Sequence, residues 1–362
     1  MFHGFHKIEL TVRSLLVGDF GAAAVLIAFG AVLGKVNSYM LIIMATILII
    51  FQTLNEEIGV AVYHATDVGG SMYVHTFGAL FGVSCAWMYR PKGYKKVPRS
   101  SYYNMMFSCI GTIFLWMYWP SFNGGPITGN SQHRAFVNTV LALCCSCIGV
   151  FLTSHVIRKG LFDMEDILNA TLAGGVAIGT SADMNTLPFV AMIIGFFAGI
   201  ISCCGFAFLS PALQKIGIHD TCGVINLHGI PGILAGTIGA IYSGVAHEDT
   251  YGSDLGVIWS ERAGDDPRGR NAQGWFQAAC LFTTIVIAIA SGLLTGLLFN
   301  IPKIWDKPEE IYSDAQFWHL EEIDIDYGEK GDPSGHNNQV HNREDSHENL
   351  NSSRGRREES KD

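Results

Sequence analysis

Nine apolar runs, each about as long as a bilayer is thick, constrain this chain more than any other feature. About 20 helical residues span a hydrocarbon core roughly 30 Å thick, and runs near that length recur through most of the 362 residues. Hydrophobic residues make up 49% of the chain and charged residues only 15%, which is typical of membrane proteins. We therefore predict an all-α polytopic membrane protein with spans at approximately 15–34, 40–63, 70–89, 101–122, 135–157, 164–182, 188–213, 223–245 and 274–301.

The net charge of −9 comes entirely from the C-terminal part of the chain. Residues 308–362 contain fifteen acidic and six basic residues, whereas the preceding 307 residues contain seventeen of each. This tail has too few apolar residues to offset the entropy of ordering it. We predict an N-terminal segment 1–14, a membrane domain 15–305 and an acidic, mostly disordered tail 306–362, and we expect no nucleic acid partner.

The basic residues between the spans indicate an orientation. If the nine spans alternate across the bilayer, the linkers on one side carry eleven Lys and Arg residues and those on the other side carry six. The richer set, which includes five basic residues in 90–100, faces the cytoplasm under the positive-inside rule. We therefore predict a multi-pass protein of the plasma membrane with a cytoplasmic C-terminus, an external loop 246–273 and an external N-terminus.

One sparse motif occurs twice, 153 residues apart. The pattern Asp-x2-Gly-x4-His begins at Asp67 and at Asp220 and ends at His75 and His228. A histidine in an apolar run is often a satisfied core residue, but an ionisable group within a span is costly and marks a functional site by default. The two runs cross in opposite directions, as in inverted repeats that build a site near the midplane. The second repeat then has five spans and the first only three, so we expect two helices of the first repeat to be absent.

The acidic residue at the start of each motif has two interpretations. Asp67 and Asp220 can cap backbone N–H groups and complement the helix dipole, which is the favoured reading. Alternatively, Asp67 helps to attract a cation from the external side. A metal site is disfavoured because no third ligand stands at a fixed spacing from either histidine, and the nine cysteines are interpreted as small core residues. We expect no metal, no other cofactor and no enzymatic activity.

Longer motifs resemble the ammonium transporter superfamily and, within it, the Rh glycoprotein branch. The resemblance covers about residues 15–305 and rests on AFGAVLGKV (28–36), DVGGSMYVHTFGALFG (67–82), GTIFLWMYWPSFN (111–123), SQHRAFVNT (131–139), NATLAGGVAIGT (169–180) and HDTCGVINLHGIPGILAG (219–236). It implies two inverted five-helix repeats, here N-terminally shortened, in a trimer with one pore through each subunit. It also implies that His75 and His228 line an apolar pore and that Phe20 and Phe122 form its outer gate.

The resemblance implies transport of ammonium or ammonia. Ammonium would lose its proton near the gate and pass the uncharged histidines as NH3, because an uncompensated ion in hydrocarbon is costly. The chain has no phosphate-binding G-x4-G-K-[ST] loop, so we expect passive permeation. Two alternatives stay open: a carbon dioxide channel, and a non-conducting shortened subunit that regulates full-length Rh trimers. The expected partners are the lipid bilayer, ammonia or ammonium, carbon dioxide under the first alternative, and other subunits in a homotrimer or a heterotrimer with related Rh subunits.

Overall fold

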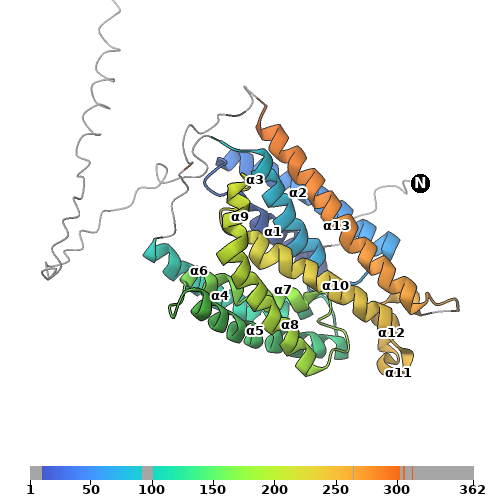
Figure 1. The fold of residues 1–362 in the computed structure, drawn as a ribbon. Coiled ribbons are helices and arrows are strands. Elements are labelled where there is room, and N and C mark those ends of the chain that lie inside the picture. Colours follow the sequence, from blue (N-terminus) through green and yellow to red (C-terminus); the bar gives the residue numbers. More distant parts are fainter. Residues whose placement is uncertain (1–9, 92–100, 264, 302–304, 306–311, 313–362) are drawn as a thin grey trace, which may run out of the picture. The chain divides into compact units, whose positions relative to one another are not determined.

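The computed structural model describes residues 10–91, 101–263 and 265–301, together with Trp305 and Tyr312. These residues form helices and no strand (Figure 1). The helices are α1 (Val12–Val32), α2 (Ser38–Glu57), α3 (Phe77–Met88), α4 (Tyr102–Gly124), α5 (Asn130–Ile157), α6 (Met164–Ala170), α7 (Ala173–Gly179), α8 (Pro188–Cys204), α9 (Ser210–Lys215), α10 (Ile230–Val245), α11 (Glu248–Tyr251), α12 (Asp254–Ile258) and α13 (Arg270–Phe299), with a 3-10 turn at Ser260–Arg262 and π-helical segments at Ile58–Tyr63, Ser71–Thr76, Gly205–Leu209 and Ile225–Gly229.

Part of what the sequence predicts lies outside the described residues. This applies to residues 1–9 of the N-terminal segment, to residues 92–100 of the basic loop, and to the acidic tail 306–362 apart from Tyr312. The membrane domain 15–305, in contrast, is described almost completely.

Every predicted span overlaps one or more helices. Within the described residues, seven stretches are long and apolar enough to cross a membrane: Val12–Val32, Ser38–Tyr63, Tyr102–Gly124, Asn130–Ile157, Pro188–Lys215, Ile225–Val245 and Arg270–Phe299. The chain is therefore an integral membrane protein.

The two remaining predicted spans are helical but interrupted. Span 70–89 combines the π-helical segment Ser71–Thr76 with the 12-residue α3. Span 164–182 divides into α6 and α7, which have seven residues each, and every residue of α7 is buried. The small residues of AGGVAIG allow α7 to lie close to α5 and α8, so this span packs against protein rather than lipid.

The packing of the two repeats is reciprocal. Helix α1 packs on α3 in the first repeat, and α7 packs on α10 in the second. Helix α3 also contacts the π-helical segment Ile225–Gly229, while α10 contacts Ser71–Thr76. Helix α13 packs against both α3 and α10. The repeats therefore meet at the two π-helical segments, which contain the two histidines of the repeated motif.

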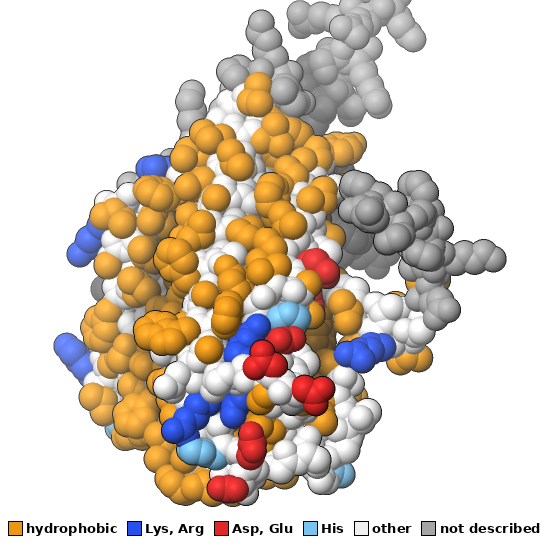
Figure 2. Space-filling model, turned by 90° about the vertical axis from the view of Figure 1, so that its right-hand side faces the viewer, with side chains coloured by type: hydrophobic (Ala, Val, Ile, Leu, Met, Phe, Trp, Pro, Cys, Tyr) orange, Lys and Arg blue, Asp and Glu red, His pale blue; other side chains and the backbone are white. Residues whose placement is uncertain are grey.

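The side chains on the outer surface are those of a membrane protein. Figure 2 shows hydrophobic side chains over most of one face and acidic side chains gathered toward its lower end. Exposed large apolar side chains occur along the long helices, for example Ile50 of α2 and Phe282 of α13. Such contiguous apolar surface is rare on soluble monomers and is expected for helices that contact lipid acyl chains.

A prediction about stability follows from the contact between α5 and α8. A methyl group added at Gly195 would overlap the carbonyl oxygen of Ala142, whereas one added at Gly111 of α4 would meet nothing within 4 Å. We expect Gly195→Ala to lower the free energy of unfolding by about 1–3 kcal/mol through overpacking. Gly111→Ala is the matched control and should be neutral or slightly stabilising. Equal melting temperatures for the two variants in detergent would contradict this packing.

Candidate conduction site

The repeated motif folds into the same local structure in both repeats. After Asp67 the chain turns at Gly70, where φ is 64°, and after Asp220 it turns at Gly223, where φ is 69°. These left-handed conformations favour glycine because a Cβ atom would be strained there. Each turn leads into a π-helical segment, and each segment contains the histidine of its motif.

Asp67 is bonded to the start of its π-helical segment. Its Oδ2 accepts hydrogen bonds from the backbone N–H groups of Met72 (2.7 Å) and Tyr73 (2.9 Å), and its Oδ1 accepts one from the hydroxyl of Thr180 (2.5 Å). Burial raises the pKa of Asp67 to about 6, although these hydrogen bonds oppose the shift. The geometry is that of a capping carboxylate that also joins the two repeats.

Asp220 has the equivalent position in the second repeat and lies near a buried lysine. Its Oδ2 accepts a hydrogen bond from the N–H of Ile225 at 2.9 Å. Lys35, in the loop after α1, donates to the carbonyl oxygens of Ala31 (2.5 Å) and His219. Burial lowers the pKa of Lys35 to about 8, and the carboxylate of Asp220 opposes that shift. Burial also raises the pKa of Asp220. This cluster connects the end of α1 to the start of the second motif.

The structure brings the two predicted pore histidines into direct contact. Nδ1 of His75 and Nδ1 of His228 are 3.1 Å apart, and the two rings are nearly parallel at 2°. His75 is only 4% exposed, and it lies parallel to the indole ring of Trp119, with a centroid distance of 5.6 Å. His75 Nε2 has no hydrogen-bond partner among the described residues, so this nitrogen retains its capacity for one.

The two predicted gate residues also lie together. The ring centroids of Phe20, from α1, and Phe122, from α4, are 4.4 Å apart. The ring of Phe122 in turn lies 5.6 Å from that of His75. Four side chains predicted from sequence therefore form a continuous row from Phe20 through Phe122 and His75 to His228.

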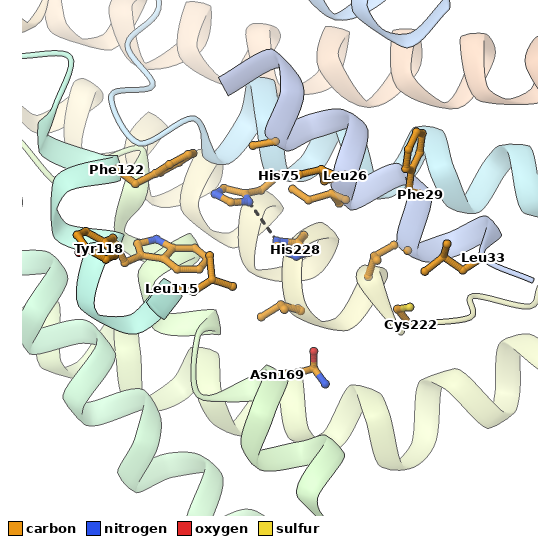
Figure 3. A pocket seen from close by; sticks show the side chains of 16 residues that line it. Leu26, Phe29, Leu33, His75, Leu115, Tyr118, Phe122, Asn169, Cys222 and His228 are labelled. Carbon is orange, nitrogen blue, oxygen red and sulfur yellow. Dashed lines mark hydrogen bonds between the residues drawn. The ribbon is translucent and has the colours of Figure 1, made fainter. Parts of the chain in front are cut away.

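A largely apolar cavity of about 660 Å³ surrounds the histidines, and we call it the histidine cavity. Its wall includes His75, His228 and Phe122, and it extends to Cys222 before α10. Figure 3 shows the bonded histidines with Phe122 and Tyr118 on one side and Leu26 on the other. Tyr118 and Leu26 line the cavity but are 59% and 67% exposed. The histidine cavity is therefore open to the exterior of the protein between α1 and α4.

We call Phe20 and Phe122 the phenyl pair. A smaller cavity of about 240 Å³, which we call the acidic cavity, adjoins this pair. Phe20 lines it, whereas Phe122 lines the histidine cavity. Three carboxylates contribute to its wall, those of Glu56, Asp67 and Asp183. The row of aromatic and histidine rings thus begins at the acidic cavity and ends in the histidine cavity.

Two features of the site were not predicted from the sequence. Trp119 stacks on His75, and the quoted motif GTIFLWMYWPSFN contains it, but nothing in the sequence distinguishes it from neighbouring aromatic residues. Asp183 lines the acidic cavity from the loop after α7. Its only sequence signal is an acidic residue directly after a predicted span.

Comparisons with known proteins show which family this chain is similar to. A family model described as "Ammonium Transporter Family" matches residues 1–318. The ammonium transporter Rh type C of Canis lupus familiaris is 41% identical over 332 residues, which are 89% of this chain and 72% of that protein. The ammonium transporter Rh type B of Danio rerio is 41% identical over 346 residues, which are 93% of this chain and 75% of that protein.

Solved structures have the same fold. The Rh50 structure from Nitrosomonas europaea is 30% identical, with a TM-score of 0.69 over 86% of this chain and 76% of that one. The Mep2 structure from Saccharomyces cerevisiae, at 18% identity, has a TM-score of 0.65 over 86% of this chain and 68% of that one. The all-α ammonium transporter fold predicted from the sequence is therefore confirmed, whereas the count of nine spans and the absence of two helices from the first repeat stay predictions.

Proposed function

The chain belongs to the Ammonium Transporter Family, and we propose that it conducts neutral NH3 past the histidine pair. The observation that carries this proposal is the 3.1 Å contact between His75 and His228 inside a largely apolar cavity. The cavity offers no charged side chain to a permeating ion, because its lining is apolar apart from the two imidazoles and a few neutral polar groups. Desolvating ammonium there would be costly, whereas NH3 needs only hydrogen-bond partners.

The histidine pair supplies both kinds of partner when each ring is neutral. A neutral imidazole carries one N–H donor and one acceptor nitrogen. If one Nδ1 donates to the other, the donating ring has an acceptor at Nε2 and the accepting ring has an N–H at Nε2. A passing NH3 molecule can therefore donate to one ring and accept from the next without any change in charge.

In this proposal, ammonium loses its proton at the phenyl pair. Phe20 and Phe122 stand between the acidic cavity and the histidine cavity. Under the orientation predicted from Lys and Arg counts, the acidic cavity faces outward and the C-terminal tail lies in the cytoplasm. In this proposal the protein resides in the plasma membrane as a homotrimer or as a heterotrimer with related Rh subunits.

Reconstituted liposomes test the proposal. With a pH dye inside, an inward ammonium gradient should raise internal pH several times faster in liposomes that contain the chain than in protein-free ones, because NH3 takes up a proton on arrival. A parallel carbon dioxide gradient, which acidifies the lumen, tests the alternative cargo. Rates equal to those of protein-free liposomes for ammonia would contradict conduction by this chain.

The opening between α1 and α4 favours a second candidate function. Leu26 and Tyr118 line the histidine cavity while being largely exposed, so the wall of the passage is not closed by the described residues. A chain with this wall can act as a non-conducting subunit that modulates complete Rh subunits. Such a chain would be silent in the liposome assay alone and would change the flux of a co-reconstituted Rh type C protein.

The phenyl pair gives a separate prediction. Phe20 contacts Phe122 but does not line the histidine cavity, so Phe20→Ala should widen the constriction without removing a histidine contact. We expect a methylammonium-evoked current to appear in planar bilayers, because a wider and wetter constriction lowers the cost of passing a cation. The control is Phe114→Ala, which alters an exposed ring of α4. Silent bilayers with Phe20→Ala would contradict a gating role.

A further inference from the structure

The histidine cavity opens between two helices that touch only near one end. Helices α1 and α4 meet at the phenyl pair, where the ring centroids of Phe20 and Phe122 are 4.4 Å apart. Further along the same two helices, Leu26 of α1 and Leu115 of α4 line the cavity and are exposed. Figure 3 shows both leucines beside the histidine pair. The opening therefore lies past the phenyl pair, with one leucine on each side.

The position of the opening along these helices determines what lies against it. Leu26 and Leu115 are well inside α1 and α4, and both helices are long and apolar enough to cross a membrane. Because a helix rises 1.5 Å per residue and the hydrocarbon core is roughly 30 Å thick, the two leucines lie at the depth of the acyl chains. Among the described stretches that can span a membrane, α4 is also the least buried in protein. The opening therefore faces lipid acyl chains.

The wall behind the opening has nothing to offer water. Every residue that α1 and its C-terminal cap contribute to the lining is apolar: Ala23, Leu26, Ile27, Phe29, Gly30 and Leu33. A buried water molecule needs about two to four polar partners, and these side chains supply none. An empty space would also cost free energy, because the side chains around it would lose dispersion contacts on one side. A hydrocarbon occupant satisfies this wall.

The volume of the cavity distinguishes an acyl chain from a protein helix. An α-helix with its side chains is about 10–12 Å across, so two turns of it occupy roughly 850 Å³ or more. The histidine cavity has a volume of about 660 Å³. A helix of a partner or of a second copy can cover the opening but cannot fill the cavity, whereas a thin, flexible chain of methylene groups can enter it.

We propose that one acyl chain of a membrane phospholipid enters between α1 and α4 and occupies the α1 side of the histidine cavity. The chain packs against Leu26, Leu33 and Leu115, and it completes the apolar wall that the described residues leave open. The inference goes beyond the proposed function and does not depend on it, because it requires only that the cavity be open to hydrocarbon.

Trp119 reports on the occupant of the cavity. Its indole ring lines the histidine cavity, stacks on His75 and is only 4% exposed, so lipid at the outer surface of the protein does not reach it. Bromine atoms on an acyl chain quench indole fluorescence at close range. The full chain should be reconstituted in a phospholipid brominated at mid-chain, with the emission lost in Trp119→Phe defining the Trp119 component. That component should fall by half or more relative to the unbrominated lipid.

Two double variants test whether the chain enters through this opening. Leu26→Phe combined with Leu115→Phe enlarges one side chain on each side of the opening and should protect the Trp119 component from quenching. The matched control combines Leu294→Phe with Leu297→Phe, which makes the same change at exposed leucines of α13 that line neither cavity. Quenching in this control should equal that of the wild-type chain.

Three results would overturn the proposal. The first is a Trp119 component that stays unquenched in the wild-type chain, as expected if a second copy or a partner helix covers the opening. The second is equal quenching in the two double variants, which would place the lipid elsewhere. If Trp119→Phe does not fold, native mass spectrometry takes its place: the wild-type chain should retain one phospholipid more than the Leu26→Phe, Leu115→Phe variant. Equal retention is the third result.

Discussion

Replacing His75 with Phe should reduce protein-dependent ammonia flux about fivefold. The substitution removes the 3.1 Å contact with His228 and leaves the His228 ring without this partner. It also removes one polar partner from the passage. A net hydrogen bond is worth about 1 kcal/mol, and about 1.4 kcal/mol in a barrier changes a rate tenfold. Flux in liposomes with an internal pH dye measures the effect, and His228→Phe should behave similarly.

The matched control for this substitution is His133→Phe. His133 lies in α5, is exposed and lines neither cavity, so the same chemical change should leave flux unaltered. Equal flux in the His75 and His133 variants would show that the paired imidazoles do not contribute to conduction.

Replacing Asp67 with Ala should destabilise the protein strongly. The substitution leaves the N–H groups of Met72 and Tyr73 and the hydroxyl of Thr180 without their acceptor. At about 1 kcal/mol for each orphaned group, the free energy of unfolding should fall by at least about 3 kcal/mol. Asp67→Asn keeps an acceptor oxygen and should lose much less. Thermal unfolding in detergent measures both variants. Equal melting temperatures for Asp67→Ala and Asp67→Asn would contradict the capping role of Asp67.

The pH dependence of stability provides a second test of Asp67. Because burial raises its pKa from 3.8 to about 6, the folded state binds a proton between those values that the unfolded state does not. The contribution of Asp67 to stability is therefore fully present below about pH 4 and is lost as pH rises through about 6. Asp67→Asn should remove this component. A melting profile of Asp67→Asn with the wild-type slope over that range would contradict the assignment.

The sequence was sufficient to predict the helical membrane fold because apolar length is a direct physical signal. It also predicted which residues meet: the two copies of Asp-x2-Gly-x4-His lie in reciprocal positions, and His75 and His228 are in contact. The spacing was informative because Gly70 and Gly223 both make left-handed turns directly before the segments that contain the histidines. Phe20 and Phe122 depended on the family resemblance, since apolar rings in apolar runs carry no positional signal of their own.

Other features depend on tertiary packing and have no local signature. Both histidines lie in π-helical segments, a geometry that recurs at functional sites but that hydrophobic periodicity does not reveal. The division of span 164–182 into α6 and α7 follows from burial against α5 and α8. Oδ1 of Asp183 accepts no hydrogen bond from any described residue because Arg134 is held by Asp254 and Ser131, and Asp254 is 120 residues from Arg134 in the sequence.

The central claim is that neutral NH3, and not ammonium, passes the histidine pair. The charge carried per transported molecule of ammonia tests this claim most directly. Current and pH should be recorded together across a planar bilayer containing the chain while an ammonium gradient is applied, with His75→Phe as the reference for passage through lipid. We predict alkalinisation on the receiving side without current, because NH3 crosses and its proton stays behind. One elementary charge per transported ammonia, without alkalinisation, would contradict the account.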